Sequence, residues 1–337
     1  MRRTLALAIV VAALSGPVAA SAHGPRAVTE IQLVTGNGLM GGDAATFRAD
    51  DPLTQGELAS LLAELTGAPQ PAPAEPARPA TIAQLDAGFV RALGLRGAAR
   101  RFALAARDAG LAPPARFGTE VVARLLGFRR DHPGALDSAE PSPSAPASRA
   151  EAAWSAAKVL RWKGWELQYA KDLAAGFAVP PLSDDQRAVL HEAISLIGYP
   201  YVLGGISERP QSPFGTLLAG GFDCSGYVWR VFRLSSLAAN APLAATLRGR
   251  TTFELAAEVS KAERIPFGAI EPADVLFFGA RGPRSKPAEI DHMGIYLGAG
   301  WMISAASTGV SLAPVATGVY RERFAWARRP LVEAAQL

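Results

Sequence analysis

The chain has 337 residues, long enough for one larger domain and one or two smaller units that each bury a core. Its 34 Lys and Arg residues against 30 Asp and Glu residues give a formal charge of +4, too small to indicate a nucleic-acid-binding protein. The single cysteine excludes an internal disulfide and, with only four histidines, forms no zinc-site spacing, so we expect no metal and no cofactor.

The first residues have the pattern of an export signal. Two arginines precede an apolar run over residues 5–14, and Ala20-Ser21-Ala22 supplies the small residues that signal peptidase requires. The run is shorter than the roughly 20 residues that cross a bilayer, which favours a signal peptide over residues 1–22 rather than a membrane anchor. We therefore expect a secreted protein that begins at His23 and has no membrane span after cleavage.

Proline-rich stretches divide the rest of the chain. Residues 67–79 and 138–147 are predicted to be extended connectors, and Val179-Pro180-Pro181 marks a further break. The segments that remain are residues 24–66, 80–172 and 183–330. The sequence therefore predicts two N-terminal units ahead of a larger C-terminal domain.

The first segment, residues 24–66, combines a predicted helix with a glycine-rich turn at 38–42 and the loop Thr46-Phe47-Arg48. Thr54 and Glu57 have the spacing of a capping box and predict the start of a second helix. This order of elements resembles an S-layer homology module.

Two later stretches resemble parts of the same module. Ser148-Arg149-Ala150-Glu151 repeats the helix start and residues 110–127 are a candidate for a shortened middle copy, so residues 80–172 are interpreted as a degenerate helical region of this kind. The resemblance implies binding of an anionic secondary cell-wall polymer through an arginine at the helix start. That position is Gln55 in the first copy and Arg149 in the last. A helical spacer without polymer binding is the alternative.

The only cysteine of the chain lies at a predicted helix start. Asp223 precedes Cys224 as an N-cap, and apolar residues follow at helical spacing, namely Tyr227, Val228, Val231 and Phe232. The partial positive charge at a helix N-terminus stabilises a thiolate, so the sequence predicts a reactive Cys224 with a low pKa rather than a structural one. Free N–H groups of the first turn can also face an oxyanion.

His292 is the candidate base for this thiol. It begins a predicted strand over residues 292–297, which a turn centred on Ala299 joins to a second strand over 301–305. In this pairing Ser304 lies diagonally from His292 on the same face, where its hydroxyl can orient the imidazole. The other histidines lie at the signal cleavage point, in a loop outside the C-terminal domain and on a solvated helix face.

Five motifs then follow in order along the C-terminal domain. They are Tyr201-Val202-Leu203-Gly204-Gly205, Phe222-Asp223-Cys224-Ser225-Gly226, Arg250-Thr251-Thr252, Pro272-Ala273-Asp274-Val275-Leu276-Phe277-Phe278 and His292-Met293-Gly294-Ile295-Tyr296-Leu297-Gly298. Together they resemble the NlpC-type cell-wall cysteine peptidases. The resemblance implies an α+β, papain-like fold in which the Cys helix packs on an antiparallel sheet, behind a mainly α-helical N-terminal region.

The resemblance also implies roles for individual residues. The expected set is Cys224 as nucleophile, His292 as base, Ser304 in the third catalytic position, and Tyr201, Asp223 and Ser225 as substrate-binding residues.

Three features depart from the family pattern. Ser304 stands where the family usually has a histidine, and it reaches less far. Ala273 stands where the family has a glycine, which matters only if that residue needs a positive φ. The loop from Ile206 to Gly221 is long, which alters access to the site.

The function implied is that of a secreted, wall-associated peptidoglycan hydrolase. The expected reaction is cleavage of stem peptides, at the γ-D-glutamyl to diamino-acid bond, through a thioester on Cys224. Two alternatives stay open: a wall-binding protein whose peptidase site is impaired, which Ser304 favours, and an acyl transferase on the same fold.

Overall fold

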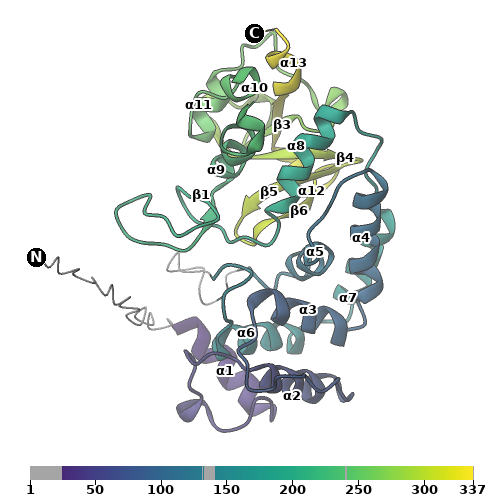
Figure 1. Ribbon diagram of the computed structural model, residues 1–337, viewed down its shortest axis with the longest axis vertical. Coiled ribbons are helices and arrows are strands. Elements are labelled where there is room, and N and C mark those ends of the chain that lie inside the picture. Colours follow the sequence, from purple (N-terminus) through teal and green to yellow (C-terminus); the bar gives the residue numbers. More distant parts are fainter. Residues whose placement is uncertain (1–24, 131, 133–140, 240, 337) are drawn as a thin grey trace, which may run out of the picture.

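A computed structural model describes residues 25–130, 132, 141–239 and 241–336, so the predicted signal peptide over 1–22 lies outside the described residues. A helical N-terminal part is followed by a C-terminal part that combines helices with an antiparallel sheet (Figure 1), which confirms the predicted α+β class. Within the described ranges, no helix has the length and apolar character needed to cross a bilayer.

Four helices of the N-terminal part pack in two pairs, α1 with α6 and α2 with α3. They are α1 (Pro25–Gly36), α2 (Gln55–Thr66), α3 (Ile82–Ala92) and α6 (Arg149–Leu160). The residues before three of the helix caps form a closed ring of backbone hydrogen bonds: Leu53 donates to Ala147, Ala147 to Ala80, and Ala80 to Leu53, at 2.7–2.8 Å. The two predicted N-terminal units are therefore joined through their helix starts.

The three helix starts share one capping chemistry. Thr54 and Glu57 form the predicted capping box of α2, and Ser148 caps α6 through the amide of Glu151. The third capped start is Thr81, at α3, and not the predicted middle copy over residues 110–127. Residues 117–125 of the predicted middle copy form α5, which has no side-chain cap.

The remaining N-terminal helices join this arrangement to the C-terminal part. They are α4 (Arg96–Asp108), α5 (Phe117–Leu125) and α7 (Glu166–Gly176). Phe102 of α4 and Phe177 after α7 pack on Trp301, with ring centroids 5.9 and 5.3 Å away. Arg124 of α5 donates hydrogen bonds to the carbonyls of Thr308 and Gly198.

The C-terminal part is built on a five-stranded antiparallel sheet of order β6-β5-β4-β3-β7. The strands are β3 (Val275–Gly279), β4 (Ile290–Gly298), β5 (Trp301–Ala306), β6 (Gly309–Pro314) and β7 (Phe324–Arg328). In the β4–β5 pair Ile295 lies opposite Ile303, as the predicted turn requires, and a bulge then sets Gly298 opposite Trp301.

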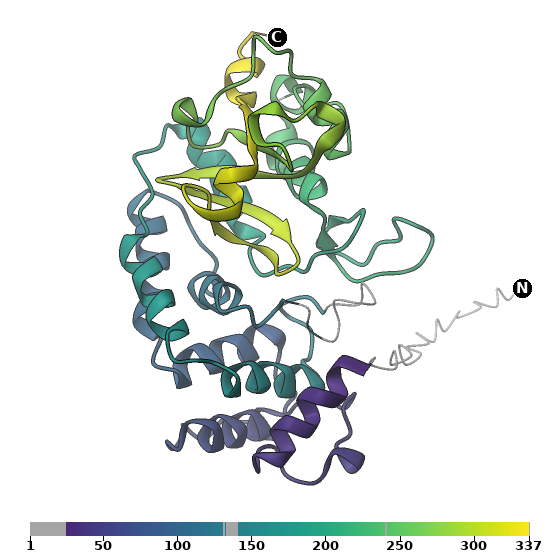
Figure 2. The same cartoon turned by 180° about the vertical axis from the view of Figure 1, so that it is seen from behind.

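Helices cover the faces and edges of this sheet (Figure 2). They are α8 (Asp184–Ser195), α9 (Cys224–Trp229), α10 (Ala241–Ala245), α11 (Thr252–Ala257), α12 (Gly318–Arg323) and α13 (Pro330–Ala334). The π-helical segment η3 (Arg230–Leu234) continues α9, and the short strands β1 (Ile206–Ser207) and β2 (Gly221–Phe222) pair with each other beside it. Helix α9 packs on β4 and β5, which sets its first residue against the sheet.

Ala273, at the turn before β3, has a strained backbone. Its φ is 71°, in the left-handed region that costs a residue with a Cβ about 1–2 kcal/mol. A glycine at this position would avoid the cost, so the departure from the family pattern at Ala273 has a physical consequence.

Candidate active site

Cys224 is the first residue of α9, as predicted. Asp223 has an extended backbone and caps the helix, because its carboxylate accepts a hydrogen bond from the amide of Gly226. The apolar residues that follow are completely buried, namely Tyr227, Val228, Val231 and Phe232. The buried face of α9 and η3 therefore fixes the orientation in which the thiol is presented.

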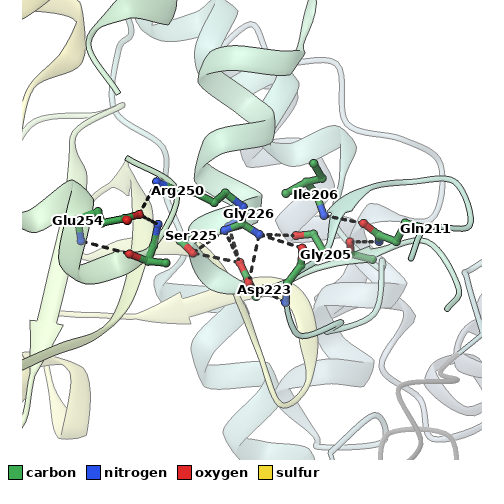
Figure 3. Close-up of polar contacts among 11 residues, drawn as sticks. Gly205, Ile206, Gln211, Asp223, Ser225, Gly226, Arg250 and Glu254 are labelled. Carbon is green, nitrogen blue, oxygen red and sulfur yellow. Dashed lines mark hydrogen bonds and ion pairs between the residues drawn. The ribbon is translucent and has the colours of Figure 1, made fainter. Parts of the chain in front are cut away.

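A polar network holds this helix start in place (Figure 3). Nη1 of Arg250 lies 2.8 Å from the Ser225 hydroxyl and 3.2 Å from Oδ1 of Asp223, and Nη2 lies 3.0 Å from the carbonyl oxygen of Gly204. Oδ2 of Asp223 accepts from the amide of Gly204. The arginine thus ties the Cys helix to the loop that follows Tyr201.

Asp223 and Ser225, expected as substrate-binding residues, have most of their hydrogen-bonding capacity used inside the protein. Both are buried, at 9% and 4% exposure, and both bond to Arg250. Their geometry supports a structural role, in which they hold the start of the Cys helix in place.

The thiol of Cys224 does not have the low pKa that its helix position predicted. Burial raises the pKa to about 11, and the neighbouring Asp223 carboxylate raises it further, whereas the amides of Met293 and Ser225 lower it. The helix N-terminus is present, but desolvation of the 8%-exposed thiol outweighs it. In the free protein at neutral pH the thiol is therefore protonated.

His292 lies in a cluster of three rings, which we call the ring cluster and define as Phe278, His292 and Tyr320. The imidazole centroid lies 5.8 Å from that of Phe278, its cross-strand partner, and 5.5 Å from that of Tyr320, on which it stacks at 29°. Phe278 and Tyr320 also meet, with centroids 5.3 Å apart.

This environment favours the neutral imidazole. Burial lowers the pKa of His292 to about 4, the Arg323 guanidinium lowers it as well, and Asp291 opposes both. Nε2 of His292 is shielded from solvent and has no hydrogen-bond partner among the residues that the structure describes. A neutral imidazole can accept a proton, as a general base must.

Cys224 and His292 lie at the same end of the α9–β4 contact. The amide of Met293, the residue after His292, is close enough to the Cys224 sulfur to lower its pKa. No hydrogen bond joins the thiol to the imidazole in the described structure, and such bonds are often long before substrate binds. Strand β4 therefore passes beside the Cys224 thiol at the residue that follows His292.

Ser304 does not hydrogen-bond to His292 in the described structure. A Cβ built on Gly294 would lie 2.9 Å from the Cβ of Ser304, so Ser304 faces Gly294 and is diagonal to His292, as the predicted register requires. Its hydroxyl instead acts on Tyr320, whose pKa burial raises and the Ser304 hydroxyl lowers as a hydrogen-bond partner.

Tyr201 lies near the nucleophile, as expected. The half-buried residue forms a backbone bridge with Phe222, two residues before Cys224. Burial raises the pKa of its phenol to about 12, and Cys224 and Asp223 contribute to the rise. Tyr201 therefore lies on the side of the thiol toward β2.

The long loop between β1 and β2 is held at its base and exposed at its tip. Gln211 accepts from the amide of Ile206 and donates to the carbonyl of Gly221 at 2.8 Å each (Figure 3). Phe214 and Leu217 are 70% and 73% exposed at the tip. The loop thus presents apolar side chains next to the segment that carries Tyr201.

The sequence did not indicate Tyr320 as part of the site. It lies on α12, a short helix without a motif, and only tertiary packing brings it against His292. Arg250 was noted within a motif, but its contacts with Asp223 and Ser225 were not predicted. Within the described ranges, three or more His, Cys, Asp or Glu side chains nowhere gather as metal ligands would.

Comparisons with known proteins find separate matches for the N-terminal and the C-terminal part of the chain. Residues 198–329 match the NlpC/P60 family, and residues 20–59 match the S-layer homology domain. The probable endopeptidase YafL of Escherichia coli is 31% identical over 149 residues, which are 44% of this chain and 51% of that protein. The γ-D-glutamyl-L-lysine dipeptidyl-peptidase of Bacillus subtilis is 26% identical over 125 residues, 37% of this chain and 33% of that protein.

Among solved structures, an NlpC/P60 family protein from Bacillus cereus is similar, with 22% identity, a TM-score of 0.33, and coverage of 46% of this chain and 43% of that one. The similarity to curated relatives covers between a quarter and about half of the length of those proteins.

Proposed function

We propose that this chain, which contains an NlpC/P60 domain and an S-layer homology domain, is a secreted cysteine endopeptidase that cleaves peptidoglycan stem peptides at the cell wall. One observation carries the proposal: Cys224 begins a capped helix, and its sulfur lies beside the amide of the residue that follows His292. The candidate nucleophile therefore lies beside the strand that carries the candidate base, at a helix start whose first-turn N–H groups suit an oxyanion.

In the proposed reaction, the Cys224 sulfur attacks the carbonyl carbon of the scissile peptide while its proton passes to His292. The carbonyl oxygen becomes an oxyanion that faces the first-turn amides of α9. The amine then leaves with the proton from His292, which leaves a thioester on Cys224. His292 next takes a proton from water, the hydroxide attacks the thioester carbonyl, and the thiol is restored.

The resting site holds a neutral pair. With the pKa of Cys224 raised to about 11 and that of His292 lowered to about 4, neither group is charged at pH 7. Proton transfer therefore accompanies attack on the bound substrate, in contrast to a site that stores a thiolate and an imidazolium.

The bond we propose is the one between γ-D-glutamate and the diamino acid of the stem. The Bacillus subtilis relative, which is similar over 125 residues of this chain, is named for γ-D-glutamyl-L-lysine. Digestion of purified peptidoglycan, followed by mass spectrometry of the released peptides, tests this choice. Products that end in D-glutamate support it, and products cut elsewhere in the stem contradict it.

We further propose that the N-terminal part retains the enzyme on an anionic wall polymer. A pocket of about 390 Å³ lies between α2 and α3, lined in part by Gln55, Gln84, Arg91 and Arg96. Its two arginines suit an anionic ligand, and Gln55 occupies the helix-start position that contacts polymer in the family. Arg149, the arginine at the start of α6, instead pairs with Glu57 and covers the Phe47 ring.

The retention proposal can be tested without digestion of the wall. Full chains from residue 23 that carry Cys224→Ala should co-sediment with polymer-bearing sacculi, and replacing both Arg91 and Arg96 with Ala should release them. The matched control replaces Arg100 and Arg101 of α4, which lie outside the pocket lining. Equal recovery with polymer-stripped sacculi would identify the N-terminal part as a spacer.

The second candidate function is a wall-binding protein with an impaired peptidase site. The absence of a Ser304–His292 hydrogen bond in the described structure favours it, because the imidazole then lacks the polar partner that usually fixes a catalytic histidine. An intact chain that binds sacculi but releases no stem fragment would establish this alternative. An acyl transferase would instead form new peptide bonds when an amine acceptor is supplied.

A further inference from the structure

We propose that Tyr320 positions the imidazole of His292, and that Ser304 acts on His292 through the Tyr320 hydroxyl rather than directly. The inference rests on the proposed function in that it concerns the base of the same site. It assigns the orienting role to a residue on α12, outside the two strands that carry His292 and Ser304.

The position of Ser304 on β5 puts the His292 imidazole beyond the reach of its hydroxyl. Ser304 faces Gly294, so it is a diagonal neighbour of His292 across the β4–β5 pair. Diagonal residues of antiparallel strands are about 7–8 Å apart at Cα, which a long side chain can bridge but a serine hydroxyl cannot. A direct hydrogen bond from Ser304 to the imidazole is therefore geometrically unfavourable.

Tyr320, in contrast, lies directly against the imidazole. Its ring stacks on the imidazole at a centroid distance of 5.5 Å and an interplanar angle of 29°, and it also meets Phe278 edge-on. Contact with both other members of the ring cluster restricts rotation of the imidazole about its side-chain bonds. The face of the phenol ring also attracts positive charge, and His292 becomes positive when it takes the Cys224 proton.

Tyr320 also interacts with Ser304. The buried Ser304 hydroxyl is near enough to the Tyr320 phenol to lower its pKa, as a hydrogen-bond partner does. The positive charges of Arg130 and Arg323 also lower the pKa of Tyr320, and Cys224 raises it. Tyr320 thus stacks on His292 and also interacts with Ser304. Phe278, which is completely buried on β3, supplies only an apolar wall.

A double-mutant cycle separates the indirect from the direct role of Ser304. Ser304→Ala, Tyr320→Phe and the double variant should each lower kcat by the same factor, roughly two- to tenfold as for loss of one hydrogen bond, with KM unchanged. Tyr320→Leu, which also removes the stacked ring, should cost roughly tenfold or more. Tyr296→Phe is the matched control, because it removes a tyrosine hydroxyl that bonds Gly300 in the same apolar cluster.

The same cycle is to be measured by NMR on the ring protons of His292, assigned with His292→Gln, so that the test does not depend on turnover. Charged groups facing the imidazole are Arg323 on α12 and Asp291 on β4, and both are unchanged in these variants. Tyr320→Leu should remove the ring-current shift of His292, and Tyr320→Phe should retain it. The shifts caused by Ser304→Ala should disappear in the Tyr320→Phe background.

Two results would overturn the inference. One is an effect of Ser304→Ala on His292 that persists in full when Tyr320 is Phe, which would show a direct contact. The other is a Tyr320→Leu variant whose His292 ring shift and kcat match those of the unsubstituted chain. If the unsubstituted chain has no peptidase activity but the NMR cycle behaves as expected, the proposed function fails and the positioning role of Tyr320 stands.

Discussion

Nη1 of Arg250 lies 2.8 Å from the Ser225 hydroxyl, and the same guanidinium reaches the carbonyl of Gly204. One side chain therefore joins the first turn of the Cys helix to the loop after Tyr201. It also neutralises the carboxylate of Asp223, which is only 9% exposed. The arrangement makes Arg250 a structural support of the site through its contacts with Asp223, Ser225 and Gly204.

Arg250→Ala is expected to destabilise the fold by about 1–3 kcal/mol, because it leaves Asp223 and Ser225 without their cationic partner. It should also reduce activity, since the cap of α9 loosens. Thermal unfolding and stem-peptide release measure the two effects. The control is Arg248→Ala, an exposed arginine two residues away, which should change neither. Equal stability of the two variants would show that the network contributes little.

The imidazole of His292 is expected to titrate far below the ordinary histidine pKa of about 6.5. Because burial and Arg323 lower the pKa to about 4, activity that needs the neutral base should be lost as pH falls through about 4 and be unaffected from pH 6 to 7. An NMR titration of the ring protons gives the midpoint. Arg323→Gln should raise it, and Arg321→Gln, on the same helix but over the Phe267 ring, should leave it unchanged. A midpoint near 6.5 would contradict this account.

Ala273→Gly tests the strain at the turn before β3. Relief of the left-handed backbone strain should raise the free energy of unfolding by about 1–2 kcal/mol. The greater flexibility of glycine in the unfolded chain and the loss of a buried methyl group should lower it by a similar amount, so the net change should be close to zero. Ala305→Gly is the control, because Ala305 is buried on β5 with a normal φ and should lose about 1–2 kcal/mol. Chemical unfolding of both variants measures the difference, and equal losses would show that Ala273 is not strained.

Glu120 is expected to make stability depend on pH. Burial raises its pKa to about 7 and Asp86 adds to the rise, although Arg124 opposes it. The folded protein therefore holds a proton that the unfolded chain releases above about pH 4.5, so stability falls as pH rises from about 4.5 to 7, by up to about 1.4 kcal/mol per pH unit. Glu120→Gln should flatten this slope in unfolding experiments. The same slope in both proteins would exclude Glu120 as its source.

The sequence could predict those features that depend on residues close together along the chain. The caps at Thr54 and Asp223 were predicted because a capping side chain and its amide lie within three residues. The pairing of Ile295 with Ile303 followed from a short turn between alternating strands. These elements were enough to predict the α+β class and the place of Cys224.

Features that depend on tertiary packing were not predictable in the same way. The pKa of Cys224 depends on desolvation by the sheet, which the helix position alone does not reveal. Tyr320 meets His292 only because α12 folds back over β3 and β4. The third capped start at Thr81 had the right spacing to Gln84, but its place in the ring of helix starts became visible only through the backbone hydrogen bonds.

The central claim is that Cys224 performs peptide hydrolysis on peptidoglycan stems. The most direct measurement is the rate at which the full chain from residue 23 releases stem fragments from purified sacculi, compared with Cys224→Ala at equal concentration. The account predicts steady release by the unsubstituted chain, loss of release in Cys224→Ala, and no difference between the two in thermal stability beyond about 1 kcal/mol. Equal release by the two chains, or no release by either, would contradict it.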